Sequence, residues 1–213
     1  MKYDVVIVAS GKGQRANLGY NKVFHIMKDG KTVLDHSIDL FYDDKDCINI
    51  IVVTNEEYFD QIKDNDKLVK VVGGEYRKDS VFNGLNKVTS EYVFVHDGAR
   101  PFIRKENIDE LKQEVVKKKA VILGHMASDT IKQIDGDRIV KTIDRETIFL
   151  AETPQVFKTD ILVDCYRRCE DIIFTDEASL VESLGYDVYV VKNRYSNPKL
   201  TIHDDFNNIW LKK

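Results

Sequence analysis

The 213-residue sequence has few of the residues that break a chain or cross-link it. It holds three prolines and three cysteines, and no Pro-rich or Ser/Gly-rich stretch marks a linker between domains. Cys47, Cys165 and Cys169 make an odd set without C-x-x-C spacing, which argues against a disulfide scaffold or a zinc ribbon. We therefore expect a single domain over residues 1–213, with a hydrophobic core of ordinary size.

Long apolar runs and an excess of positive charge are also missing. No apolar run approaches the roughly 20 residues that a membrane helix needs, and the N-terminus lacks the small-residue cleavage site of a signal peptide. The 32 basic and 36 acidic side chains give a net charge of −4, which excludes a general polyanion-binding surface. We expect a cytoplasmic protein that binds neither membranes nor nucleic acids, and any phosphate site must be built from locally clustered cations.

Short apolar runs alternate along the chain with amphipathic helical segments. The runs are unbroken and rich in β-branched and aromatic residues, as in strands covered on both faces; they span residues 3–9, 48–54, 68–72, 92–96, 120–126 and 187–191. Helices are predicted over residues 32–42, 105–119 and 176–184, the last with Thr175 as its N-cap. The alternation predicts an α/β fold with a mostly parallel, twisted sheet, whose ligand site lies beyond the carboxyl ends of the strands.

One segment departs from this alternation. Residues 129–134 and 137–142 flank Asp135-Gly136, a dipeptide typical of tight hairpin turns. A two-stranded hairpin by itself is marginally stable in water, so this one should pack against something. It is either an edge hairpin on the main sheet of its own chain or an arm, at about residues 128–150, that packs on a second copy of the chain.

A glycine-rich loop follows the first predicted strand, with Ala9, Ser10, Gly11 and Gly13 in sequence. Glycines let a backbone approach a ligand closely and turn successive N–H groups toward an anion. The spacing also satisfies the dinucleotide fingerprint of nicotinamide-dependent oxidoreductases. That alternative is disfavoured, because residues 17–21 are poor helix formers and the ribose-binding acid after the second strand is missing.

Two cations accompany the loop, Arg15 and, seven residues later, Lys22. A guanidinium and an ammonium on one loop can contact a triphosphate from more than one side. Single basic residues in a loop are usually only solvated, but two beside a glycine-rich turn at a strand end favour a phosphate site.

Two further segments follow strands and carry polar groups. The stretch from Gly74 through Arg77 to Ser80 offers a turn, a cation and a hydroxyl at a helix start, where anions are favoured; an ordinary capped helix start is the alternative. After the fourth strand, Asp97 suits a hard cation or a ribose, and Arg100 suits a phosphate. The alternative there is a salt-bridged turn.

The order of motifs resembles a known family. The succession AxGxGxR…K, GGxxRxDS, HDxARPF, DTxK, DR…TPQxF, TDEAS and NxKxT, from Ala9 to Thr201, is similar to the 2-C-methyl-D-erythritol 4-phosphate cytidylyltransferases of the non-mevalonate isoprenoid pathway. The resemblance implies a Rossmann-like nucleotidyltransferase domain with a protruding β-hairpin arm that forms a homodimer. It also implies a reaction of CTP with 2-C-methyl-D-erythritol 4-phosphate, giving 4-diphosphocytidyl-2-C-methyl-D-erythritol and pyrophosphate, with Mg²⁺ or another divalent cation.

The resemblance also implies roles for individual residues. Arg15 and Lys22 match the family's catalytic cations. The positions that match nucleotide-binding residues are Ala9, Ser10, Gly11, Gly13, Gly74, Arg77, Ser80 and Gly98. The positions that match acceptor-binding residues are Asp97, Arg100, Thr130, Arg145, Thr175 and Lys199, with Asp97 also a candidate metal ligand.

Several positions depart from the family pattern without removing a charged catalytic residue. Asn21 stands where a proline usually precedes the catalytic lysine. Ser10 replaces a usual alanine or glycine, Gly98 replaces a usual alanine, and Glu152 stands where glutamine or another residue is common. The C-terminal segment, residues 195–199, instead resembles the related ribitol 5-phosphate cytidylyltransferases. A polyol-phosphate acceptor is therefore the alternative to methylerythritol phosphate.

Overall fold

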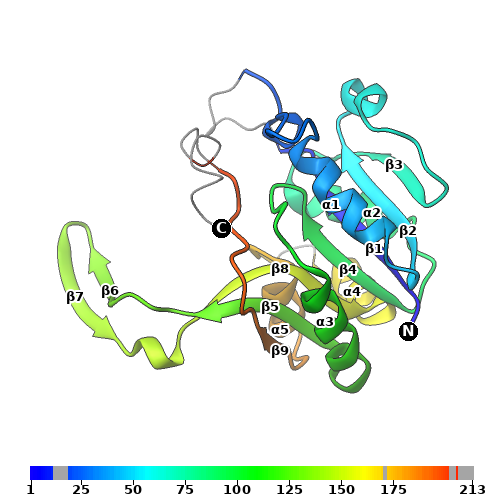
Figure 1. Cartoon of the computed structure of the whole chain (residues 1–213). Helices are drawn as coiled ribbons and strands as arrows, with labels where there is room; N and C mark the ends of the chain where they lie inside the picture. The colour runs from blue at the N-terminus through cyan, green and yellow to red at the C-terminus, as the bar shows by residue number, and fades with distance from the viewer. Residues whose placement is uncertain (12–18, 170–171, 202–204, 206–213) are drawn as a thin grey trace.

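The computed structural model describes residues 1–11, 19–169, 172–201 and 205. Its centre is a seven-stranded sheet in the order β3-β2-β1-β4-β8-β5-β9 (Figure 1). The strands are β1 (Tyr3–Val8), β2 (Cys47–Thr54), β3 (Leu68–Val72), β4 (Tyr92–Asp97), β5 (Ala120–Met126), β8 (Phe149–Lys158) and β9 (Tyr189–Lys192). All neighbours run parallel except β8, which is antiparallel to both β4 and β5. The predicted α/β fold with a mostly parallel sheet is confirmed.

The central strand β8 is the one that sequence patterns do not predict. Its middle carries Glu152, Pro154 and Gln155, which break an apolar run. Ile122 of β5 pairs with Gln155 while Gly124 pairs with Ala151, so the residues between them form a bulge. Because Pro154 lies in this bulge, its missing N–H removes no regular ladder bond.

Helices cover both faces of the sheet and create two hydrophobic cores. They are α1 (Val33–Tyr42), α2 (Arg77–Leu85), α3 (Lys105–Lys118), α4 (Thr159–Arg167) and α5 (Glu177–Ser183), with short 3₁₀ turns η2 (Lys22–Phe24), η3 (Glu56–Gln61) and η4 (Arg145–Thr147). Side chains of α1 and α3 pack on one face and those of α2, α4 and α5 on the other. Along β1, Val5 and Ile7 join the first core and Val6 the second, as strand alternation requires. Cys165 lies in the second core.

The start of α5 corrects one prediction. Its N-cap is Asp176 and not Thr175, because the Asp176 carboxylate accepts a hydrogen bond from the backbone N–H of Ser179 at 3.0 Å. Thr175 lies one residue earlier and is exposed. The negative charges of Asp176 and Glu177 interact favourably with the helix dipole at this N-terminus.

The hairpin forms a separate two-stranded sheet of β6 (Ile131–Asp135) and β7 (Arg138–Ile143), which protrudes from the body between β5 and β8 (Figure 1). The alternative of an edge hairpin on the chain's own main sheet is therefore wrong, because β6 and β7 are not part of the seven-stranded sheet. Gly136 turns the hairpin with a φ of +56°. Ile134, Ile139 and Val140 are more than half exposed on this arm. Among the described residues, no helix is both long and apolar enough to cross a membrane.

A buried carboxylate ties the start of the sheet together. Asp4 of β1 is fully buried and accepts hydrogen bonds from the backbone N–H groups of Asn49, Thr89 and Ser90 at 3.0, 2.6 and 3.0 Å. The side chains of Asn49 and Ser90 donate to it as well. Asp4 thus joins β1 to β2 and to the turn before β4.

We expect Asp4→Ala to lower the free energy of unfolding by about 3 kcal/mol, because it leaves several buried donors without an acceptor. Urea denaturation monitored by circular dichroism measures this. Asp135→Ala, at the exposed tip of the arm, is the control and should change the stability by less than about 0.5 kcal/mol. A loss below 1 kcal/mol in Asp4→Ala would contradict the role given to this carboxylate.

Candidate active site

A pocket of about 530 Å³ opens beyond the carboxyl ends of β1 and β4, where the sheet topology predicts a ligand site. The start of α2 and the C-terminal segment before Leu200 complete its wall. Its lining residues are Val8, Ala9, Ser10, Gly11, Asn21, Lys22, Val23, Asn55, Gly74, Glu75, Tyr76, Arg77, Asp97, Ala99 and Lys199. Eight of the predicted site residues are among them: Ala9, Ser10, Gly11, Lys22, Gly74, Arg77, Asp97 and Lys199.

The glycine-rich loop and the start of α2 are joined by hydroxyl groups. Ser10 Oγ and Ser80 Oγ lie 2.8 Å apart, and the backbone N–H of Gly74 donates to Ser80 Oγ at 3.0 Å. A Cβ at Gly74 would lie 2.3 Å from Asp79 Cβ, so close packing requires glycine there. Among the described residues, a Cβ at Gly11 would meet no atom beyond its chain neighbours within 4 Å, so glycine there leaves the backbone open to a ligand.

Asn21 positions the segment that carries Lys22. Its side-chain amide donates to the carbonyl of Ala9 at 2.6 Å, and its side-chain oxygen accepts from the backbone N–H of Val23 at 3.3 Å. Asn21 is buried, and it caps the 3₁₀ turn η2. A side chain that hydrogen-bonds the end of β1 thus stands where the family pattern has proline, and Lys22 is directed to the pocket.

A cluster of cations surrounds the carboxylate of Asp97 at the end of β4. Lys199 Nζ donates to Oδ2 at 2.7 Å, Arg77 Nη2 donates to Oδ1 at 3.3 Å, and Arg100 Nε lies 3.9 Å from Oδ2. Burial by itself would raise the pKa of Asp97, but Arg77 and then Lys199 outweigh it and hold that pKa well below its ordinary value. Asp97 is therefore salt-bridged, with partners from three separate segments of the chain.

Sequence patterns missed Glu177 as a member of this cluster. It is the first residue of α5 and fully buried, and its two carboxylate oxygens accept from Arg77 Nη1 and Nη2 at 2.7 and 3.0 Å. Tyr166 of α4 donates its hydroxyl to Glu177 Oε1 at 3.0 Å. The TDEAS motif contains this residue, but only its place at a helix start was visible in the sequence.

The other predicted residues lie outside the pocket lining. Gly98 packs under β1, where its N–H donates to the carbonyl of Val8 at 3.0 Å. Arg100 Nη1 donates to the carbonyl of Asn197 at 2.7 Å, and burial lowers the pKa of Arg100. Gly13 and Arg15 lie outside the described residues.

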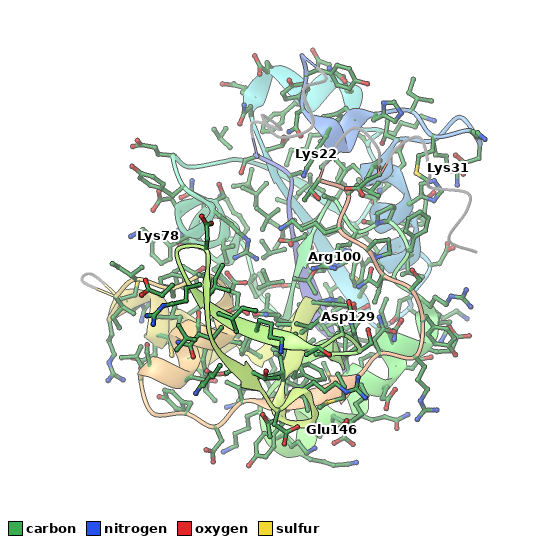
Figure 2. All side chains as sticks on the ribbon, turned by 90° about the vertical axis from the view of Figure 1, so that its left-hand side faces the viewer. Lys22, Lys31, Lys78, Arg100, Asp129 and Glu146 are labelled. Atoms are coloured by element: carbon green, nitrogen blue, oxygen red, sulfur yellow. The ribbon has the colours of Figure 1, made fainter. Side chains whose placement is uncertain are left out.

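The arm residues Thr130 and Arg145 are exposed, and Arg145 Nη1 donates to the carbonyl of Ser128 at 2.8 Å. Figure 2 shows that Lys22 and Arg100 belong to the body, while Asp129 and Glu146 belong to the arm. The arm protrudes from the body (Figure 1), and neither Thr130 nor Arg145 lines the pocket of its own chain.

A divalent cation would find few protein ligands here. Within the described part of the chain, no group of three or more histidine, cysteine, aspartate or glutamate side chains is placed to hold a metal ion. Among the residues that the structure describes, Asp97 and Glu75 are the acids that line the pocket. This set fits Mg²⁺, which commonly binds through one or two carboxylates together with substrate phosphates and water.

His96 supports the cluster from the core. Its Nε2 lies 3.2 Å from the carbonyl of Arg100 and its Nδ1 lies 3.1 Å from Thr153 Oγ1, which accepts from the N–H of Asp97 at 3.0 Å. A carbonyl only accepts, so Nε2 carries the proton. Burial lowers the pKa of His96 to about 4, and the ring is neutral at pH 7.

Comparison with known proteins decides the family. The model of the 2-C-methyl-D-erythritol 4-phosphate cytidylyltransferase family matches residues 3–209. The chain belongs to this family. The relative of that name from Halalkalibacterium halodurans is 37% identical over 96% of this chain and 94% of its own, and the one from Bacillus licheniformis is 39% identical over 96% and 93%.

Solved structures agree with this assignment. The Francisella tularensis 2-C-methyl-D-erythritol 4-phosphate cytidylyltransferase superimposes with a TM-score of 0.86 at 31% identity, over the whole of both chains. The Anaerococcus prevotii 4-diphosphocytidyl-2C-methyl-D-erythritol synthase gives 0.85 at 30% identity. Membership of a cytidylyltransferase family makes the chain a nucleotidyltransferase and disfavours the nicotinamide-dependent oxidoreductase suggested by the glycine spacing.

The neutral state of His96 predicts a pH dependence of stability. Burial lowers the pKa of His96 from its ordinary value of 6.5 to about 4, so below pH 6.5 the unfolded chain binds the extra proton. The free energy of unfolding should therefore fall as the pH drops from about 6.5 to 4, by up to about 3 kcal/mol from this residue. Urea titrations of the wild type and of His96→Gln across this range measure it. Equal pH slopes in the two proteins would contradict the prediction.

Proposed function

We propose that this chain transfers the cytidylyl group of CTP to 2-C-methyl-D-erythritol 4-phosphate, releasing pyrophosphate and 4-diphosphocytidyl-2-C-methyl-D-erythritol. The supporting observation is that eight of the residues matching the family's motifs line one pocket, with Lys22, Lys199 and Asp97 on its wall. The family match over nearly the whole chain supports the same activity.

The reaction needs positioning and positive charge more than proton transfer. An acceptor phosphate oxygen, already ionised at neutral pH, attacks the α-phosphorus of CTP in line. No general base is required, which agrees with the buried, neutral and fully bonded state of His96. The obstacle is repulsion between two polyanions, so Lys22, together with Arg15, is proposed to neutralise the crowded α-phosphate.

The remaining roles divide between nucleotide and acceptor. The backbone around Ser10, Gly11 and Gly74 is proposed to hold the nucleotide, and Ser80 holds this backbone through its contacts with Ser10 and Gly74. Asp97, Arg100, Thr175 and Lys199 are proposed to hold the acceptor. Asp97 is the candidate protein ligand for Mg²⁺, which when bound would supply Lewis acidity at the phosphates.

The arm is proposed to form a homodimer. Its exposed Ile134, Ile139 and Val140 offer apolar surface that an isolated hairpin leaves in water. The separation of Thr130 and Arg145 from their own pocket supports a role for both residues at the acceptor site of a second copy.

The acceptor is tested by measuring pyrophosphate release with CTP and Mg²⁺ against 2-C-methyl-D-erythritol 4-phosphate and, in parallel, ribitol 5-phosphate. The names of the relatives favour the first. A higher kcat/KM with ribitol 5-phosphate would select the polyol-phosphate alternative, and no release with either would reject the proposal.

Lys22→Ala should lower kcat about a hundredfold or more, because removing one charge aimed at the transition state costs roughly 3 kcal/mol. The pyrophosphate assay at saturating substrates measures this. The control is Lys31→Ala, an exposed lysine paired with Asp39 away from the pocket, which should keep wild-type turnover. Near-full activity of Lys22→Ala would remove its catalytic assignment.

If Arg145 serves the partner's pocket, Lys22→Ala and Arg145→Ala should complement each other. Each homodimer should be nearly inactive, whereas coexpressed chains form mixed dimers in which one of the two sites keeps both residues. Purified through two different affinity tags, the mixed dimer should recover up to about half of the wild-type activity per dimer. No recovery in mixed dimers would show that Arg145 acts within its own chain.

A further inference from the structure

The guanidinium of Arg77 is held almost entirely by protein carboxylates. Its Nη1 and Nη2 donate to the two oxygens of Glu177, and its Nε and Nη2 donate to Asp97 Oδ1 at 3.4 and 3.3 Å. An arginine side chain has five N–H donors, so these four bonds leave one for a ligand. Arg77 lines the pocket, but it has little capacity to bind a phosphate directly.

Glu177, the carboxylate partner of Arg77, is held in place by burial and by a further hydrogen bond. Glu177 is fully buried, and the Tyr166 hydroxyl adds a third hydrogen bond to its carboxylate. Tyr166 is itself buried, with its ring stacked 5.8 Å from that of Phe82 of α2. The bidentate geometry fixes the guanidinium plane, which a single hydrogen bond would not do.

Lys199, the other cation on Asp97, is held differently. It makes one hydrogen bond to Asp97 Oδ2. Its side chain is 37% exposed, and its ammonium is carried on a flexible four-carbon stem. A substrate phosphate entering the pocket would compete with Asp97 for this ammonium. Arg77 is then the cation that stays hydrogen-bonded to Asp97, because Arg100 Nε lies 3.9 Å from the carboxylate, beyond hydrogen-bond distance.

We propose that Glu177, supported by Tyr166, is a positioning residue: it fixes Arg77 so that Asp97 keeps its orientation when a substrate phosphate draws Lys199 away. This inference rests on the proposed function, since it assigns Lys199 to a substrate phosphate. It also gives Arg77 an indirect role in place of a direct nucleotide contact.

The test compares Glu177→Gln, Tyr166→Phe and Arg77→Lys, with Glu182→Gln as the matched control at an exposed position of the same helix. Circular dichroism establishes that each variant is folded at the assay temperature. Asp97 is the candidate protein ligand of the Mg²⁺ that accompanies CTP, so its orientation should affect CTP as well as the acceptor. In the presence of Mg²⁺, Glu177→Gln should lower kcat/KM for CTP at least tenfold and weaken CTP binding in calorimetry at least fivefold. Tyr166→Phe should lower kcat/KM about two- to fivefold, and Glu182→Gln should leave both quantities unchanged.

Non-additivity separates positioning from a merely structural role. If Glu177 acts through Arg77, the double variant Glu177→Gln/Arg77→Lys should be no slower than Arg77→Lys alone, within about twofold. Folded Glu177→Gln with kcat/KM and CTP affinity within twofold of the wild type would overturn the inference, as would multiplying effects in the double variant.

Two outcomes need separate handling. If Glu177→Gln does not fold, Tyr166→Phe decides: its effect should disappear in the Arg77→Lys background, and persistence would overturn the inference. If the wild type releases no pyrophosphate with either acceptor, the proposed function fails. The CTP affinities of the same variants then decide the inference by the same criteria.

Discussion

The ionised carboxylate of Asp97 is the group on which the rest of the site depends. A buried carboxylate without partners would take up a proton rather than remain charged. Here Arg77, Lys199 and Arg100 approach it from α2, from the C-terminal segment and from the turn after β4. One charge therefore holds α2 and the C-terminal segment, both distant in the sequence, together with the adjacent turn after β4, around a single pocket.

The sheet explains why this convergence occurs at one edge. Strands β1 and β4 are adjacent and parallel, so Val8 pairs with Asp97 and both end beneath the glycine-rich loop. The backbone N–H of Asp97 is held by Thr153, whose hydroxyl is also bonded to the buried His96. The antiparallel strand β8 thus positions Asp97 through Thr153, although none of its residues lines the pocket.

The pairing of a fixed cation with an exchangeable one is suited to a pocket that must receive phosphates. A buried ion pair such as Arg77–Glu177 gives definite geometry more than stability. The Lys199–Asp97 contact is a single hydrogen bond from a partly exposed, flexible side chain, so the ammonium can turn to another anion without moving the backbone. Arg77 and Lys199 both contact the Asp97 carboxylate, so the same group is held in a fixed position by one cation and gives up the other when a phosphate binds.

The sequence by itself determined the α/β class, the positions of six strands and most of the residues that meet in the pocket. It could do so because apolar runs, glycines and strand-end polar residues are local patterns. It did not predict β8, where Glu152 and Gln155 are buried only because distant residues hydrogen-bond them. Nor could it choose between two placements of the hairpin, since its weak alternation suits either.

Only the tertiary structure decided which charges meet. Arg77 and Glu177 are 100 positions apart, and Asp97 and Lys199 are 102 positions apart, so no spacing in the sequence reveals their contacts. Whether a carboxylate binds a substrate, a metal or a neighbouring arginine depends on what the fold brings within about 3 Å of it. For this reason the sequence shows which charged residues lie near strand ends, but not which of them pair with one another.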